Sequence, residues 1–460
     1  MGKRRRRRRW PWIVSTVLVF ALALSVGGLV IFKPDLLSLG AQAAPSPSAA
    51  AEAPPAPVLA AAATQAPATS RLAAQLEPLL AGTVLGNSIR VSVVDLRGGR
   101  PIFERDPGVA TVPASNAKIV TAVAVLGTLG AAHRITTHAV AGPNPGEVVL
   151  VGAGDATLSA GPDGPYEGAG RLDDLADQVK KALGGTAPTK VITDGSLYQG
   201  PVLGPAWDPD APDEGYVSNI TALMIDGGRV DPKDRDAPYT MSPDPELAAG
   251  QAFARLLGVT EVTKGKAPAG AATLGEVKSA PMIRQLERVL GNSDNTLAES
   301  LARQVAVAKG KPASFDGAGE ALDQVLTELQ LPAGQFDMVD GSGYSRNNRL
   351  SPSVLTGVLA RAADGTRPGL SDLFNALPVA GWSGSMDYRF AKPEAAGGLG
   401  VVRAKSGTLR SVNSISGIVQ TVDGGLIAFA VLAENVPTWQ LPAQDALDRI
   451  VAQIASCGCS

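Results

Sequence analysis

The stretch Pro113-Ala114-Ser115-Asn116-Ala117-Lys118 runs directly into the largely apolar segment Ile119–Leu126. A run of this kind predicts a buried helix. Ser115 and Lys118 are three positions apart, which places both side chains on one helical face, close enough to exchange a proton. Ser115 would also lie at the helix N-terminus, where unpaired N–H groups favour negative charge. Taken alone, the stretch is read first as a Ser/Asn helix cap followed by a solvated lysine, so the rest of the chain decides.

The composition predicts a globular protein without a metal site. The chain has 460 residues, 45% of them hydrophobic and 18% charged, which suits one large domain or two to three ordinary ones. Its net charge is −2, yet seven of its 41 basic residues form the run Lys3–Arg9, so the remainder is acidic and no nucleic-acid partner is expected. His133 and His138 are too few for a zinc cluster, and we expect no cofactor. Cys457 and Cys459 receive no role.

The N-terminus predicts export. Residues 1–9 form a basic cytoplasmic segment, and residues 10–32 contain no charge, which is long enough to cross a bilayer core of about 20 residues. A nuclear-localisation or nucleic-acid patch is the alternative for the arginines, but the adjoining apolar span disfavours it. Ala41-Gln42-Ala43 resembles a signal-peptidase site. We favour a retained anchor over a cleaved signal; in both cases the body lies outside the cytoplasm, behind the Ala/Pro-rich linker 44–69.

Residues 70–134 and 281–456 are predicted to form one α+β domain. A helix at 71–82 precedes two hairpin strands, Ser88–Asp95 and Pro101–Arg105, and then the helix of Ser115. We expect an antiparallel sheet flanked by the first and last helices, with a helical subdomain on one side. The later helices and strands are predicted at Pro281–Leu290, Asp294–Ala308, Phe315–Leu331, from Ser351-Pro352 onward, and at Gly400–Leu409, Ser414–Thr421, Gly425–Glu434 and Pro442–Ala455.

Residues 135–280 differ in pattern and are predicted to form an inserted mixed domain. Loops rich in Gly, Pro and Asp are frequent there. The pattern predicts one clear helix, Arg171–Leu183, and three short strands, Ile135–Val140, Val148–Val151 and Lys190–Thr193.

Three short motifs occur in order along the chain. Ser115-Asn116-Ala117-Lys118 is its one Ser-x-x-Lys, and Lys405-Ser406-Gly407-Thr408 contains its one Lys-[Ser/Thr]-Gly, on a predicted strand. Ser293-Asp294-Asn295 lies in a turn before a helix, although Ser-x-Asn also occurs at Ser345 and Ser411 and is weak alone. Together they resemble the signature of class A β-lactamases and penicillin-binding proteins.

The chemistry of these residues fits that resemblance. Ser115 needs a neighbouring base, and Lys118, kept partly neutral by burial and by Lys405, can serve. Ser293 can relay a proton to the leaving amine, and Asn295 can orient the substrate amide. Lys405, Ser406 and Thr408, in the Lys-Ser-Gly-Thr strand that also holds Gly407, suit a substrate carboxylate. The backbone N–H groups of Ser115 and Thr408 would form an oxyanion hole.

The spacing of the motifs selects a branch of the superfamily. Ser115 and Ser293 are 178 residues apart, and a further 112 residues lead to Lys405. This long first gap resembles the D-alanyl-D-alanine carboxypeptidase/endopeptidase family, the class C low-molecular-mass penicillin-binding proteins, which carry an inserted domain there. Further segments resemble that family: Gly152–Leu158, Thr193–Tyr198, Asp340–Arg346, Leu350–Pro352 and Leu377–Gly381. The chain departs from the family pattern at three points. Ser406 stands where threonine is usual, Ala156 stands where proline is frequent, and the insertion is short enough to suggest one inserted domain.

The resemblance implies an α/β sandwich of the penicillin-binding/β-lactamase type and a serine D-Ala-D-Ala carboxypeptidase of the cell envelope. Ser115 would be acylated by a peptidoglycan stem peptide, release D-Ala, and be freed by water; some family members also cut cross-links. β-Lactams would acylate the same serine. Two alternatives remain: a β-lactamase or D-esterase of the same superfamily, and a catalytically silent wall-binding scaffold.

Overall fold

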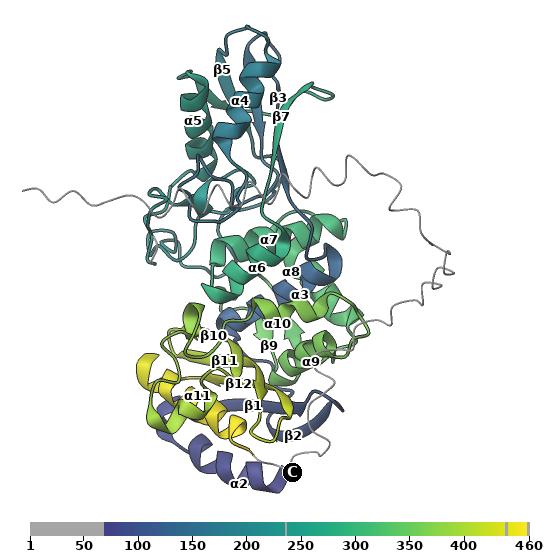
Figure 1. The fold of residues 1–460 in the computed structure, drawn as a ribbon, viewed down its shortest axis with the longest axis vertical. Helices are drawn as coiled ribbons and strands as arrows, with labels where there is room; N and C mark the ends of the chain where they lie inside the picture. The colour runs from purple at the N-terminus through teal and green to yellow at the C-terminus, as the bar shows by residue number, and fades with distance from the viewer. Residues whose placement is uncertain (1–68, 235–236, 438–439, 458–460) are drawn as a thin grey trace, which may run out of the picture. The chain divides into compact units, whose positions relative to one another are not determined.

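A five-stranded antiparallel sheet lies at the centre of the region that carries Ser115 (Figure 1). The chain's first strands complete this sheet against its last ones, since Val91 lies opposite Val431 in the β1–β12 pair. The strands, in sheet order, are β10 (Val402–Leu409), β11 (Val412–Gln420), β12 (Leu426–Glu434), β1 (Ser88–Asp95) and β2 (Arg100–Arg105).

The computed structural model describes residues 69–457 except 235–236 and 438–439. All of these residues lie in one compact unit. The predicted basic segment 1–9, the apolar span 10–32 and the linker from 44 to 68 lie outside the described residues. Within the described ranges, no helix has the length and apolarity that a membrane crossing requires.

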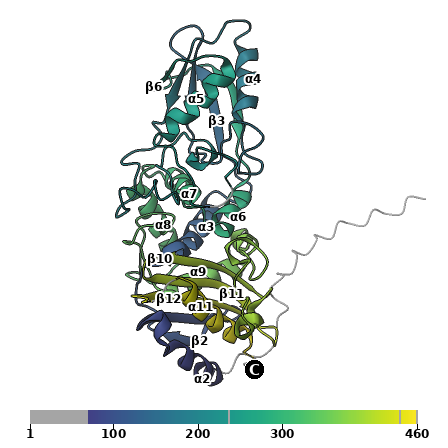
Figure 2. The same cartoon turned by 90° about the vertical axis from the view of Figure 1, so that its left-hand side faces the viewer.

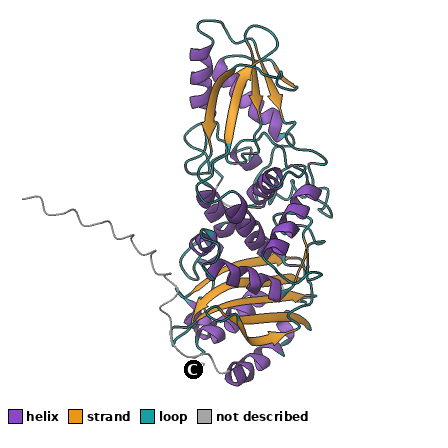
Figure 3. Ribbon diagram, turned by 90° about the vertical axis from the view of Figure 1, so that its right-hand side faces the viewer, coloured by secondary structure: helices purple, strands orange, loops and turns teal. Residues whose placement is uncertain are grey.

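Side chains of β12 alternate between two hydrophobic cores, one on each face of the sheet. Phe429 and Val431 pack into the core that helices α2 (Thr69–Leu80) and α11 (Gln440–Ala455) cover, while Ala430 and Leu432 face the other core. The period of two is that of a pleated strand buried on both sides. The first and last helices therefore cover one face of the sheet together, and Figure 3 shows helices (purple) on both sides of these strands (orange).

Helix α3 (Ala117–Thr128) runs through the second core. Every residue from Ala117 to Leu126 is buried, Lys118 and Thr121 included, as expected for a helix that is apolar on all sides. The neighbouring helices in this core are α6 (Met282–Gly291), α7 (Asn295–Ala308), α8 (Phe315–Glu328), α9 (Pro352–Ala363) and the short α10 (Leu373–Ala376).

A second five-stranded sheet is built entirely from residues between α3 and α6. It mixes parallel and antiparallel pairs and has a core of its own beneath helices α4 (Leu172–Ala182) and α5 (Pro245–Leu257) (Figure 2). Its strands, in sheet order, are β6 (Val262–Lys264), β5 (Lys190–Asp194), β4 (Glu147–Val151), β3 (Thr136–Ala141) and β7 (Thr273–Lys278).

The expectation of a single clear helix in this region was wrong, because α5 is a second one. Asp244 caps its start by accepting the N–H of Leu247 at 3.0 Å, Pro245 occupies its first turn, and Gly258 ends it in the left-handed region. These are ordinary start and stop signals that the sequence displays. Elsewhere the predicted elements agree with the structure, including Ser351 as the cap of α9. The second sheet has five strands instead of the three predicted, because β6 and β7 were missed. The short helix α10 and the two-residue strands β8 (Phe336–Asp337) and β9 (Arg349–Leu350) were not predicted either.

Candidate active site

Ser115 lies in a single 3-10 turn, Ala114–Asn116, that leads into α3. Ala114 has a φ of 48°, an uncommon conformation for a residue other than glycine, and such strain persists only where surrounding contacts enforce it. Two buried side chains do so. The Asn116 amide donates to Ser414 Oγ at 2.6 Å, and Ser414 Oγ donates to the Pro113 carbonyl at 2.8 Å. Strand β11 thus anchors the turn that presents Ser115.

Lys118 is fully buried beneath Ser115 and has three hydrogen-bond acceptors. Its Nζ donates to Ser115 Oγ at 3.0 Å, to Asn295 Oδ1 at 2.6 Å and to the Ser342 carbonyl at 2.6 Å. The predicted meeting of Ser115 and Lys118 on one helical face is therefore present. The acceptor Ser342 was missed, because it contributes a backbone carbonyl that any residue type could supply.

Burial lowers the pKa of Lys118 to about 8, because a charged amine is poorly solvated in the protein interior. The buried carboxylates of Asp340, Glu299 and Asp294 oppose this shift. Burial and then the charge of Lys118 hold the pKa of Lys405 well below its usual range, so the two lysines are close enough to repel each other. The prediction that burial keeps Lys118 partly neutral agrees with the structure.

Ser293 ends a turn that brings the second motif to Ser115. Its φ is 59°, and its Oγ donates to Ser115 Oγ at 3.0 Å. Asp294 caps α7 by accepting the N–H of Leu297 at 3.0 Å. Asn295, the first residue of the helix, donates from Nδ2 to the Tyr216 carbonyl at 3.0 Å, which directs its Oδ1 toward Lys118. Asn295 therefore contacts the lysine directly, in addition to its predicted position near a substrate amide.

Two residues from between α3 and α6 hold the second motif in place. Tyr166 donates its hydroxyl proton to Asp294 Oδ2 at 2.8 Å, and Arg229 lies 3.4 Å from the same oxygen. The Arg229 guanidinium lies over two tyrosine rings, 4.0 Å from the centroid of Tyr239 and 5.2 Å from that of Tyr166. Neither residue was predicted, and no short motif marks them.

Strand β10 places the third motif beside the nucleophile turn. Lys405 is 1% exposed, and its Nζ donates to the Ser406 carbonyl at 2.6 Å. A Cβ on Gly407 would collide with Ser414 Oγ and come within 2.9 Å of the Pro113 carbonyl oxygen. Only glycine allows the strand to lie so close to the turn of Ser115.

A cavity of about 900 Å³ opens over Ser115. Six of the eight predicted site residues line it, and the other two, Lys118 and Gly407, lie behind its wall. Its polar lining also includes Tyr216, Glu214 and Arg346, which were not predicted. Six predicted residues are in the wall: Ser115, Ser293, Asn295, Lys405, Ser406 and Thr408.

The two histidines do not take part in this site. His133 is exposed after α3, and His138 is half-buried in β3, where its Nδ1 lies 3.8 Å from a carboxylate oxygen of Glu276. The arrangement offers a serine hydroxyl, an amine of lowered pKa and a second hydroxyl in one hydrogen-bonded chain. Such a chain can activate an oxygen nucleophile and pass its proton onward.

Comparison with known proteins places the chain among carboxypeptidases. The sequence profile of the D-Ala-D-Ala carboxypeptidase 3 (S13) family matches residues 72–238 and 237–454. A carboxypeptidase of Mycobacterium tuberculosis is 39% identical over 376 residues, 80% of each chain. Carboxypeptidase DacB of Mycolicibacterium smegmatis is 37% identical over 463 residues, 99% of each chain. The crystal structure of penicillin binding protein 4 from Haemophilus influenzae shares the fold, with a TM-score of 0.67 and 20% identity over 84% of this chain and 99% of that one.

Proposed function

The chain belongs to the D-Ala-D-Ala carboxypeptidase 3 (S13) family, and on that premise we propose that it is a serine carboxypeptidase that removes the terminal D-Ala of peptidoglycan stem peptides, with Ser115 as nucleophile. One observation carries the assignment of Ser115. Its Oγ receives hydrogen bonds from Lys118 Nζ and Ser293 Oγ, both at 3.0 Å, at the wall of the large cavity. A serine without a catalytic role would not be expected to accept a hydrogen bond from a buried lysine amine.

The three acceptors around Lys118 explain how it would act as a base. As an ammonium ion it donates one proton to each of Ser115 Oγ, Asn295 Oδ1 and the Ser342 carbonyl. As a neutral amine it keeps two N–H bonds, and the Asn295 and Ser342 oxygens can only accept them. The amine lone pair is then left facing Ser115 Oγ. Loss of one proton thus converts Lys118 from a donor to Ser115 into its proton acceptor.

The reaction proceeds in two steps. Ser115 Oγ attacks the carbonyl carbon of the penultimate D-Ala while its proton moves to Lys118, and the backbone N–H groups of Ser115 and Thr408 hold the oxyanion. The C–N bond then breaks, and the proton passes through Ser293 to the leaving amine of the terminal D-Ala. Water attacks the resulting ester and loses a proton to Lys118. Lys118 returns that proton to Ser115 Oγ as the ester C–O bond breaks, which releases the shortened peptide and restores Ser115.

We assign the free carboxylate of the substrate to Lys405, Ser406 and Thr408. Lys405 is buried beside the cavity, so its pKa is well below the usual range while no anion is near. A bound carboxylate would favour its ammonium form. This pairing would select peptides with a free C-terminus, and a cross-linked D-centre carries a carboxylate in the same position. D,D-endopeptidase activity on cross-links is therefore part of the proposal.

The setting of the enzyme is also a proposal. Residues 135–280 would form an inserted domain, which is supported by their separate sheet and core. The catalytic body would work in the cell envelope, with residues 10–32 as anchor or export signal. β-Lactams would acylate Ser115, as penicillin binding protein 4 of Haemophilus influenzae is described in complex with a β-lactam.

D-Ala release tests this function. The full-length protein and Ser115→Ala are incubated with a pentapeptide that ends in D-Ala-D-Ala, with a cross-linked dimer and with a chromogenic β-lactam. We expect D-Ala from the pentapeptide with the wild type and none with Ser115→Ala. Rapid turnover of the β-lactam without D-Ala release would instead indicate a β-lactamase, and no reaction with any substrate would indicate a silent scaffold.

A further inference from the structure

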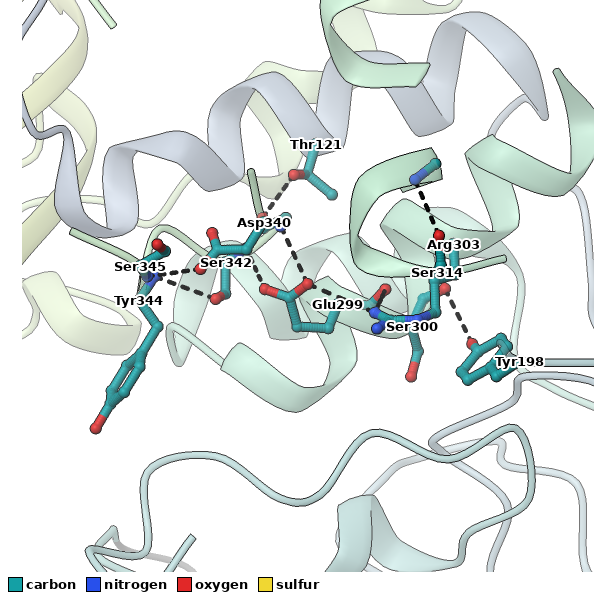
Figure 4. Close-up of polar contacts among 12 residues, drawn as sticks. Thr121, Tyr198, Glu299, Ser300, Arg303, Ser314, Asp340, Ser342, Tyr344 and Ser345 are labelled. Carbon is teal, nitrogen blue, oxygen red and sulfur yellow. Dashed lines mark hydrogen bonds and ion pairs between the residues drawn. The ribbon is translucent and has the colours of Figure 1, made fainter. Parts of the chain in front are cut away.

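The loop after β8 is held between two helices at the back of the active site (Figure 4). From α3, Thr121 Oγ1 donates to the Gly341 carbonyl at 2.6 Å, and Lys118 Nζ donates to the Ser342 carbonyl at 2.6 Å. From α7, the carboxylate of Glu299 accepts the N–H groups of Gly341 at 3.1 Å and Ser342 at 2.7 Å. Gly341 and Ser342 are thus each bonded through both the N–H and the carbonyl group, and the loop has little freedom to rotate.

Glu299 is completely buried in this arrangement. Each of its two oxygens accepts one backbone N–H, which suits an ionised carboxylate because that group only accepts. Arg303 lies one turn later on α7, with Nη1 3.7 Å from Glu299 Oε2. Arg303 is itself fixed by the ring of Phe315, 4.0 Å from its guanidinium, and by that of Tyr198 at 5.1 Å. A buried ion pair therefore backs the loop.

Glu299 follows Asn295 by four positions, so both side chains lie on one face of α7. Asn295 reaches Lys118 directly, through Oδ1. Glu299 reaches it through the backbone of Ser342. Helix α7 therefore positions both acceptors that hold Lys118 Nζ besides Ser115 Oγ. It supplies Asn295 Oδ1 directly and holds the Ser342 carbonyl through the bonds of Glu299 to the loop.

We propose that Glu299 is a positioning residue for the reaction. Its carboxylate fixes the Gly341–Ser342 backbone and thereby holds the Ser342 carbonyl against Lys118 Nζ. The role depends on the proposed function, since it requires Lys118 to be the base for Ser115. Without the two bonds from Glu299 to the loop, the neutral amine would have one fixed acceptor instead of two. Its lone pair would then no longer be directed at Ser115 Oγ.

Glu299 also acts on Lys118 by its charge. The charged groups that face Glu299 are Lys118 from α3, Arg303 from its own helix and Asp340 from the loop. Burial first, and then Asp340, raise the pKa of Glu299 to about 7, while Arg303 opposes the shift. Since the negative charge of Glu299 raises the pKa of Lys118, removing it lowers that pKa.

Other charged groups also act on the pKa of Lys118. Besides Glu299, Asp340 of the loop and Asp294 of the second motif raise its pKa, and Lys405 is its cationic neighbour on β10. None of these side chains is altered by Glu299→Gln. A change in the pH profile of that variant therefore reports on Glu299.

The test compares acylation of the full-length wild type and Glu299→Gln by a fluorescent penicillin across pH. Glutamine keeps the size of the side chain but offers one acceptor and no charge. We expect the acylation rate constant to fall on the order of 100-fold, with little change in KM for the pentapeptide. We also expect the acidic limb of the pH profile to move about one unit lower. A general loss of folded protein would lower the amplitude of labelling and would not move that limb.

Two further variants keep the test decisive. Asp323→Asn is the matched control: Asp323, on α8, is a half-buried carboxylate of raised pKa that accepts the N–H of Met338, at the start of the same loop, at 3.1 Å but does not bond Gly341 or Ser342. It should acylate at the wild-type rate. If Glu299→Gln does not fold because Arg303 is left unpaired, Glu299→Gln/Arg303→Met removes both charges. The same slowing is then expected with a smaller downward pH shift, because loss of the Arg303 cation partly offsets loss of the Glu299 charge.

The outcomes separate this inference from the proposed function. Slowing with a shifted limb in a Glu299 variant, and neither in Asp323→Asn, supports the positioning role. Wild-type rates in a folded Glu299 variant, or equal slowing in Asp323→Asn, would overturn it while Ser115 remained the nucleophile. Absence of label on the wild type would instead refute the proposed function.

Discussion

Ser293 Oγ and Ser115 Oγ are joined by a 3.0 Å hydrogen bond although 178 residues separate them along the chain. The bond links the turn before α3 to the turn before α7, and the whole second sheet is built from the residues in between. Ser115 thus contacts an amine from α3 and a hydroxyl from the turn before α7. A proton that Lys118 takes from Ser115 can therefore be passed on to a leaving group through the hydroxyl of Ser293.

Ser293→Ala should therefore slow D-Ala release without abolishing penicillin binding. The variant removes the relay to the leaving amine and leaves Lys118 and its acceptors unchanged. We expect kcat for the pentapeptide to fall by about 100- to 10,000-fold, the usual contribution of a positioned proton donor. Steady-state release of D-Ala measures it. Ser345→Ala is a control for the weak Ser-x-Asn pattern, and a wild-type kcat in Ser293→Ala would contradict the relay.

The pH dependence of acylation should follow the ionisation of Lys118. Burial lowers its pKa to about 8, and only the neutral amine can accept the proton of Ser115. The acylation rate should therefore rise with pH and level off above about 8, and at pH 7 roughly one molecule in ten is in the active form. Stopped-flow acylation from pH 5 to 10 measures this profile. A rate that does not change between pH 6 and 9 would exclude Lys118 as the base.

Gly343→Ala should damage the site more than the same change at Gly334. Both glycines have φ near +80°, so alanine costs each about 1–2 kcal/mol. At Gly334 the new methyl group meets nothing within 4 Å, whereas at Gly343 it collides with the carbonyl oxygen of Ala114, next to Ser115. We expect a further loss of about 1–3 kcal/mol and slower acylation in Gly343→Ala alone. Urea unfolding and penicillin labelling of both variants test this, and equal behaviour would contradict it.

Arg229→Met should destabilise the protein strongly. Arg229 and Asp294 form an ion pair with both side chains at most 6% exposed, and loss of one partner from such a pair costs about 3–5 kcal/mol. Arg284→Met breaks the exposed pair with Glu287 and should hardly change the urea midpoint. Urea midpoints of the two variants provide the comparison. Similar losses in both would show that the pair does not anchor the second motif.

The sequence predicted the main elements because their patterns are local. The apolar run after Lys118 and the apolar run of β12 determine burial within a few residues, and a separation of three places Ser115 beside Lys118. The contact of Ser293 with Ser115 has no such local signal, and only the family resemblance predicted it. The cap signals at Asp244 and Gly258 could have predicted α5.

Other parts of the site were out of reach for two physical reasons. Ser342 acts through its carbonyl, which every residue has, so its identity carries no signal. Glu299 lies one turn after Asn295 and could be placed on the same face, but a glutamate in a helix is normally solvated. Its burial follows from the close approach of the 340–343 loop, a tertiary contact. Tyr166 and Arg229 likewise reach Asp294 only through tertiary contacts, which no local pattern marks.

The site of penicillin attachment tests the central assignment most directly. The full-length protein is acylated with penicillin, digested and analysed by mass spectrometry, alongside Ser115→Ala and Ser293→Ala. We predict one adduct per chain, on the peptide that contains Ser115, in the wild type and in Ser293→Ala, and none in Ser115→Ala. An adduct on any other residue of the wild type, or an adduct that persists in Ser115→Ala, would contradict the assignment of Ser115 as the nucleophile.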